Sequence, residues 1–127
     1  MAQLYSLVPL AQGPFAGFDP VTRMVFGFIY DRLKLSSYHA AGNPVTKWYD
    51  PIEDRMYCVF THEELAALVG VSERTVRRSL DALKADNLVW WRKAQYRGAN
   101  RYFIHDGIMD YLKTRQSGQF VTSIRSK

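Results

Sequence analysis

Residues 61–105 read THEELAALVGVSERTVRRSLDALKADNLVWWRKAQYRGANRYFIH, and the pattern of this segment predicts the fold class. Thr61 and Glu64 have the spacing of a capping box, in which the two side chains close the first turn of a helix. Gly70 suits the left-handed conformation that ends many helices. The pattern therefore predicts a helix over 61–69. Its inward-facing residues are predicted to be Leu65, Ala66 and Leu68.

A second helix is predicted directly after this turn. Ser72 is a favourable N-cap residue, and the helix is expected to run from Glu73 to about Ala85. Its apolar residues recur at positions i, i+4 and i+7, so they form one face that packs on a core. These residues are Val76, Leu80 and Leu83. Ser79 is small at a point where close packing against another helix is expected.

Two short strands are predicted to complete this part of the chain. Residues 88–93 and 101–105 are rich in aromatic and β-branched side chains, and the segment 94–100 between them contains a glycine. Two helices joined by a tight turn and followed by a two-stranded ribbon form a winged helix-turn-helix. We therefore expect an α+β fold that is mainly α-helical with a small β wing.

The residues before this stretch predict one further helix and an arm. Asp19 and Pro20 suit the N-cap and the first helical position, and apolar residues follow at helical spacing over 19–34. Residues 1–18 are apolar and turn-rich, so we expect an N-terminal arm that docks on the body. The residues expected to pack there are Tyr5, Leu7, Phe15 and Phe18.

The remaining segments are less regular. Residues 35–54 contain many turn formers and are expected to form an irregular loop anchored by Trp48 and Tyr49. Residues 55–60 predict a short strand, and residues 106–114 predict a short final helix. A length of 127 residues suits one domain.

The expected organisation is an arm over 1–18, a winged helix-turn-helix domain over 19–113 and a polar tail over 114–127. The composition of the tail is that of a linker, and we expect it to lead to a C-terminal domain outside this sequence.

The net charge of +5 is concentrated in one region. Residues 72–105 carry eight basic and three acidic side chains, whereas residues 1–71 carry five and seven. A local basic patch is typical of proteins that bind a polyanion such as DNA. A solvated basic face is the alternative interpretation.

The helix over 73–85 is the predicted reading element for double-stranded DNA. Arginine binds guanine O6 and N7, or a phosphate, with two hydrogen bonds, so Arg74, Arg77 and Arg78 suit a major groove. The start of the preceding helix can hold a phosphate, and the wing can contact the backbone or the minor groove. The predicted DNA-binding residues are Thr61, Ser72, Glu73, Arg74, Thr75, Arg77, Arg78, Arg92, Lys93, Gln95, Tyr96, Arg97, Asn100 and Arg101.

Aromatic residues make up 14% of the chain, more than a minimal core requires. Trp90 and Trp91 alternate across a predicted strand, so one is expected in the core and the other in an interface. Proteins with a helix-turn-helix often bind two half-sites as dimers, and we expect a homodimer.

Several classes of function lack the residues they require. The single cysteine, Cys58, excludes an internal disulfide and a cysteine-rich zinc site. The sequence has no Walker-type phosphate loop and no His-x-His motif beside a nicking tyrosine, so we expect no enzyme activity, no metal and no cofactor. No apolar run approaches the length of about 18 residues that spans a membrane. We expect a bacterial cytoplasmic protein with no membrane partner.

Three segments resemble one known family. FDPVTRMVFGFIYDRLKLSS (18–37) is similar to the opening helix of the N-terminal domain in the plasmid replication initiator A family. NPVTKWYDPIEDRMYCVF (43–60) resembles the loop with an acidic turn that follows, and GANRYFIH (98–105) resembles the end of the family's wing. The family usually has proline before the Asn-Arg pair, where this chain has Ala99.

The resemblance implies a protein that binds repeated sites in a plasmid origin as a dimer and does not cut the strand. It also implies a C-terminal domain that engages host replication proteins. The helix-turn-helix alone, residues 61–89, also resembles GntR-type transcription regulators, so a DNA-binding domain of a regulator is the alternative.

Overall fold

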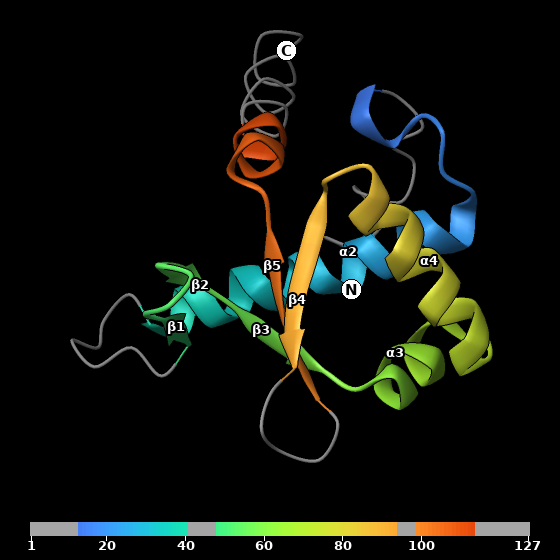
Figure 1. The fold of residues 1–127 in the computed structure, drawn as a ribbon, viewed down its shortest axis with the longest axis horizontal. Coiled ribbons are helices and arrows are strands. Elements are labelled where there is room, and N and C mark those ends of the chain that lie inside the picture. The colour runs from blue at the N-terminus through green and yellow to red at the C-terminus, as the bar shows by residue number, and fades with distance from the viewer. Residues whose placement is uncertain (1–12, 41–47, 94–98, 114–127) are drawn as a thin grey trace, which may run out of the picture.

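The computed structural model describes residues 13–40, 48–93 and 99–113. Predictions that concern Tyr5, Leu7, the wing tip over 94–98 or the tail over 114–127 lie outside these residues. In Figure 1 a three-stranded sheet stands between α4 and the β1–β2 hairpin, and α2 crosses behind it. The elements are defined below in chain order.

Helix α2, Pro20–Ala40, forms the base of the fold. The Thr22 N–H donates to Asp19 Oδ1 at 2.8 Å, which confirms Asp19 as the N-cap and Pro20 as the first helical residue. This hydrogen bond is the main reason that the pKa of Asp19 lies below its usual value. The helix extends beyond the predicted end at residue 34, because serine costs a helix interior little and no proline or glycine interrupts residues 35–40.

The N-terminal segment packs on α2 as predicted for its described part. A short 3-10 helix, η1, spans Gly13–Phe15. Phe15 and Phe18 are buried, and the Phe15 ring lies 4.9 Å from the ring of Phe26 in α2.

Helices α3, His62–Val69, and α4, Glu73–Ala85, form the predicted helix-turn-helix. Both bonds of the capping box between Thr61 and Glu64 are present, and Gly70 has a φ of +84°. Leu68 is 45% exposed, so the prediction that it faces inward was wrong. Val69, one residue further along, is the one that packs against the core with Leu65 and Ala66.

The sheet has the strand order β3-β5-β4 and is antiparallel throughout. Its strands are β3, Cys58–Phe60, β4, Val89–Lys93, and β5, Asn100–Ile104. One strand precedes the helix-turn-helix and two follow it, joined by the wing. This arrangement confirms the α+β winged helix-turn-helix fold.

A second sheet pairs β1, Tyr49–Asp50, with β2, Arg55–Met56. The predictions of an irregular segment through residue 54 and of one strand over 55–60 were therefore wrong in detail. The Tyr57 N–H bonds to the carbonyl of Trp48, so the chain leaves one sheet at Tyr57 before it enters the other. Trp48 also packs edge-on against the Tyr57 ring, which confirms its role as an anchor.

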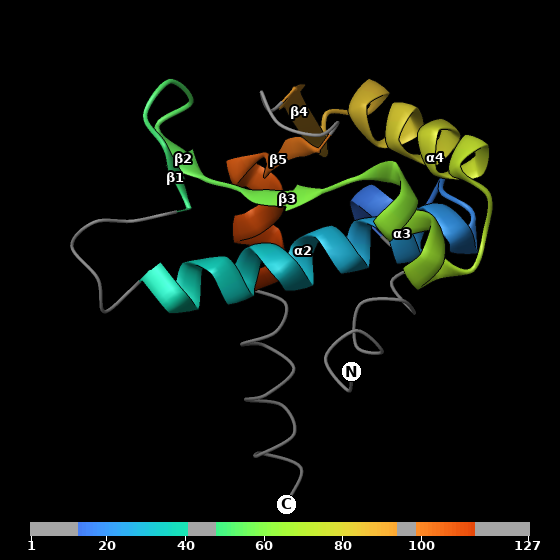
Figure 2. The same ribbon diagram turned by 90° about the horizontal axis from the view of Figure 1, so that it is seen from below.

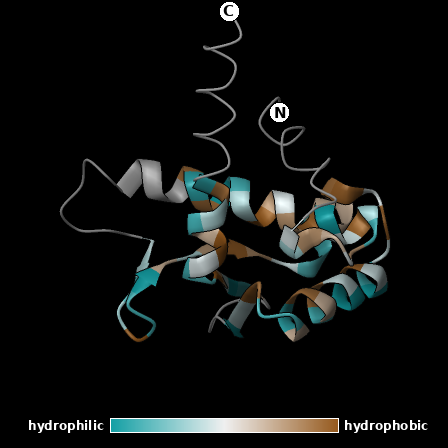
Figure 3. Cartoon of the chain, turned by 90° about the horizontal axis from the view of Figure 1, so that it is seen from above, coloured by the Kyte–Doolittle hydropathy of each residue, from teal (hydrophilic) through white to brown (hydrophobic). Residues whose placement is uncertain are grey.

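The core lies where α2, α3 and α4 meet the inner face of the three-stranded sheet. Val76, Leu80 and Leu83 are buried as predicted, and in Figure 3 hydrophobic and hydrophilic residues alternate along α4. Ser79 is buried, and its hydroxyl accepts a hydrogen bond from Thr22 at 3.0 Å, which confirms close packing of α4 on α2. Residues 106–113 form the predicted final helix.

Candidate nucleic-acid interface

Helix α4 presents three arginines to solvent. Arg74, Arg77 and Arg78, called the α4 arginines below, are exposed, while the opposite face of the helix is buried. Among the residues that the structure describes, none of the three forms an ion pair with a carboxylate. Their charge is therefore available to a ligand.

Other predicted contact residues lie near the starts of α3 and α4. The hydroxyl oxygens of Thr61 and Ser72 accept hydrogen bonds from the backbone N–H groups of Glu64 and Thr75. Because each is an N-cap, its position is fixed by the helix that it begins. Glu73 is exposed in the first turn of α4.

His62 lies at the start of α3, beside α4. Its pKa lies below the ordinary 6.5, first because the ring is partly buried and then because Arg77 is nearby. Its Nε2 atom is buried without a hydrogen-bond partner among the described residues. The ring is therefore mainly neutral at neutral pH.

Two predicted wing contacts lie on the outer face of the sheet and share one carboxylate. Arg92 in β4 and Arg101 in β5 are directly opposite in the register, so their side chains emerge on the same face. Arg92 Nη2 and Arg101 Nη1 both donate to Asp50 Oδ2, the latter at 3.0 Å. We call Arg92 and Arg101 the sheet arginines.

Asp50 is a residue that sequence reasoning missed. It is fully buried in the β1–β2 hairpin, 42 residues before Arg92, and a turn-forming role beside Pro51 was all that its neighbours indicated. Glu53 of the same hairpin lies 4.0 Å from Arg92 Nε. No local pattern predicts a pairing between segments so far apart.

The two tryptophans divide between the two faces of the sheet, as their alternation predicts. Both are half-buried, and Trp91 packs against the hydrophobic core, whereas an interface role for the other tryptophan stays a prediction. Trp90 stacks on Phe103 at 5.3 Å on the outer face, and its indole N–H donates to Glu53 Oε1 at 3.0 Å. Trp91 packs on Tyr102 on the inner face.

The other wing residues have different surroundings. Lys93 is exposed, whereas the directly opposite Asn100 is buried and donates to the Tyr102 hydroxyl at 3.3 Å. Burial raises the pKa of Tyr102 to about 12. The predicted contacts Gln95, Tyr96 and Arg97 lie outside the described residues.

Cys58 is a buried core thiol. Its Sγ lies 3.6 Å from the carbonyl oxygen of Ile29, and burial raises its pKa to about 12. Within the described segments, no three His, Cys, Asp or Glu side chains are grouped as they would be around a metal ion. No helix in those segments is long and apolar enough to cross a membrane.

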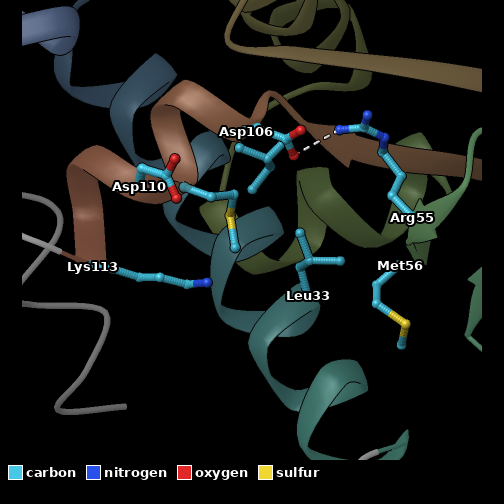
Figure 4. Close-up of a pocket in the computed structure, with 8 residues that line it drawn as sticks. Leu33, Arg55, Met56, Asp106, Asp110 and Lys113 are labelled. Atoms are coloured by element: carbon cyan, nitrogen blue, oxygen red, sulfur yellow. Dashed lines mark hydrogen bonds and ion pairs between the residues drawn. The ribbon is translucent and has the colours of Figure 1, made fainter.

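A pocket of about 390 Å³ lies away from α4, between α2, β2 and the helix over 106–113 (Figure 4). Leu33 and Met56 supply apolar contacts, and an ion pair of 2.9 Å between Arg55 and Asp106 closes one side. Its charged residues are of both signs, so the pocket has no preference for an anion.

The chain matches no protein-family model and no curated protein sequence. It is similar in fold to a solved structure described as a Rep–DNA complex, with 16% sequence identity and a TM-score of 0.56 over 78% of this chain and 70% of that one. It is also similar to the N-terminal domain of a DNA-binding protein, with 13% identity and a TM-score of 0.54 over 90% and 82% of the two chains. A third similar structure is an MDR initiator, with 14% identity and a TM-score of 0.52 over 83% and 80%. At these identities the similarity establishes the fold.

Proposed function

We propose that this domain binds double-stranded DNA sequence-specifically, with α4 in the major groove and the wing on the backbone or in the minor groove. The observation that carries the proposal is that the α4 arginines are exposed and form no ion pair with a carboxylate among the residues that the structure describes. In Figure 2 α4 and β4 lie along the same side of the molecule, away from α2. One duplex can therefore meet the helix and the wing together.

The spacing of the α4 arginines suits this role. Residues three and four apart lie on one helical face, so Arg74 is aligned with Arg77 and Arg78. A major groove about 12 Å wide accepts an α-helix, and there each base pair displays a distinct pattern of hydrogen-bond donors and acceptors. The buried residues of α4 fix the helix so that this face points outward.

The proposed setting is a plasmid replication origin, where the domain acts as part of a replication initiator. The support is the resemblance of 18–37 and 98–105 to the initiator A family, together with a Rep–DNA complex and an MDR initiator among the structures of similar fold. We propose binding as a homodimer, without strand cleavage. A transcription regulator would use the same helix and wing, so it is the second outcome of the test below.

The test is selection of bound sequences from a pool of random duplexes, followed by mapping of the enriched site onto the source replicon. Repeated copies clustered at an origin would support the initiator, and their spacing would give the geometry of a dimer. A single site upstream of a promoter would favour the regulator. Failure to enrich any sequence would contradict sequence-specific binding.

The control for this selection is the variant with Arg74, Arg77 and Arg78 all replaced by alanine. These side chains are exposed and unpaired, so the variant is expected to fold like the wild type. If it enriched the same site, α4 would not be the reading element.

A further inference from the structure

We infer that Asp50 is a positioning residue that holds Arg92 and Arg101 as a paired contact for the DNA backbone beside the wing. The inference rests on the proposed DNA binding and adds a second contact region to it. This region comes from the β1–β2 hairpin and the outer face of the sheet, and it is separate from α4.

The orientation of the Asp50 carboxylate is set by its own hairpin, independently of the two arginines. Its Oδ1 accepts the backbone N–H groups of Ile52 at 2.9 Å and Glu53 at 3.1 Å, so the turn of the hairpin sets its orientation. Its Oδ2 accepts one hydrogen bond from each guanidinium. With four donors on two oxygens and no exposed surface, Asp50 presents no free acceptor to a ligand.

The sheet arginines keep donors for a second partner. A guanidinium has five N–H groups, and the hydrogen bonds to Asp50 use one nitrogen of each. Their side chains are 36% and 34% exposed, although Arg92 Nε is buried without a hydrogen-bond partner among the described residues. The Arg101 guanidinium also lies 4.5 Å from the centre of the Tyr57 ring, which restricts it further.

The opposite role for Asp50 is competition with phosphate for the same arginines. The geometry argues against it, because Asp50 has no exposed surface and occupies one nitrogen of each guanidinium, so a phosphate can bind remaining donors without displacing the carboxylate. Glu53 is the other acid beside the pair, and it accepts the indole N–H of Trp90. Side chains already ordered by such bonds lose less conformational entropy when they bind.

The position of the pair suits a backbone contact. β4 is one of the two edge strands of the three-stranded sheet, and Figure 1 shows it between α4 and the β1–β2 hairpin. With α4 in the major groove, the neighbouring phosphates pass the edge that carries Arg92. Phosphate contacts orient a protein on DNA and carry no sequence information.

The experiment measures affinity for a short random-sequence duplex at several salt concentrations. The variant Asp50→Asn keeps the shape and the Oδ1 acceptor but loses the charge that orders the arginines. We expect its affinity to fall about tenfold, although the net charge rises, because two long side chains must then be ordered on binding. The slope of log affinity against log salt should change by less than about 1, because both arginines still reach a phosphate and each phosphate contact contributes about 0.9.

Asp110→Asn is the matched control, because it makes the same charge change at an exposed site on the helix over 106–113. It should bind the duplex as the wild type does, or slightly more tightly. Wild-type or tighter binding by Asp50→Asn would overturn the inference and favour competition. Circular dichroism and thermal melting of each variant show whether it is folded in the assay.

If Asp50→Asn does not fold, a measurement on the wild-type chain tests whether Arg92 and Arg101 contact the DNA. NMR signals of the arginine guanidinium groups are followed during titration with the same duplex. Shifts at Arg92 and Arg101, together with those of the α4 arginines, would support the inference. Shifts at the α4 arginines alone would overturn it and leave the proposed function intact, whereas no binding by any arginine would contradict both.

Discussion

Each α4 arginine and each sheet arginine adds one positive charge to the sequence, but the surroundings of the two groups differ. The three on α4 have no carboxylate partner among the described residues, while the two on the sheet share the buried Asp50. An unpaired exposed arginine can change partners at little cost to the fold, whereas a paired one is also part of the packing. A count of basic residues therefore overstates the number that are free to bind a ligand.

The largest effect is expected from Asp50→Ala, which removes the carboxylate that the two sheet arginines share. It leaves two arginines without their partner and two backbone N–H groups without their acceptor. The free energy of unfolding should fall by about 3 kcal/mol, near the lower end for a buried ion pair because the arginines are a third exposed. Urea unfolding measures this loss. Asp110→Ala is the control and should change stability by no more than about 0.5 kcal/mol.

Arg77→Ala tests the α4 side. If Arg77 pairs with a guanine, the affinity for the selected site should fall by roughly 1–3 kcal/mol and specificity should relax at one base pair. The free energy of unfolding should be unchanged within about 0.5 kcal/mol, because the side chain is exposed and forms no ion pair with a carboxylate in the described part of the chain. Fluorescence anisotropy gives the affinity, and urea unfolding gives the free energy of unfolding. A variant that lost stability but kept its affinity would show that Arg77 supports the fold and does not contact DNA.

Gly70→Ala changes the geometry between α3 and α4 and leaves every charge in place. Gly70 has a φ of +84° with open space around it, so an added methyl group costs backbone strain alone. The expected loss of stability is about 1 kcal/mol. Gly107→Ala is the matched control, because Gly107 is helical and also has open space, and alanine there should stabilise by up to about 1 kcal/mol. Thermal melting measures both variants. A change of the two melting temperatures in the same direction would contradict the left-handed conformation of Gly70 as the cause of the loss.

The smallest effect concerns pH at the start of α3. The pKa of His62 is below its ordinary 6.5 in the folded chain, so the unfolded chain takes up a proton first as the pH falls. Acidification below 6.5 should therefore lower the free energy of unfolding, and above 6.5 the contribution of this residue should be constant. In His62→Gln this part of the pH dependence should be lost, which urea unfolding on either side of that pH can show.

Most of the fold could be predicted from the sequence because its signals are local. The caps at Asp19, Thr61 and Ser72, the turn at Gly70 and the apolar face of α4 each depend on neighbours within a few positions. The exposure of Leu68 could not be predicted, because a helical position and its neighbour compete for the same packing site and only the tertiary contacts decide. The break at Tyr57 depends on a hydrogen bond to Trp48, which directly precedes β1.

In the candidate site too, the features that depend on local sequence could be predicted, and those that depend on tertiary contacts could not. The exposure of the α4 arginines follows from the helical period, so they could be identified from sequence. The pairing of Arg92 and Arg101 with Asp50 depends on the strand register and on how the β1–β2 hairpin lies against the sheet. These contacts join residues 42 and 51 positions apart, beyond the range of any local pattern.

We propose that α4 contacts base edges, whereas the sheet arginines contact the phosphate backbone of the DNA. The most direct test measures the affinities of Arg77→Ala and Arg92→Gln for the selected duplex and for a random one at the same salt concentration. The account predicts that Arg77→Ala loses affinity mainly for the selected duplex, so the ratio between the two duplexes falls. Arg92→Gln should weaken both alike and keep the ratio. An unchanged ratio in Arg77→Ala would contradict the account.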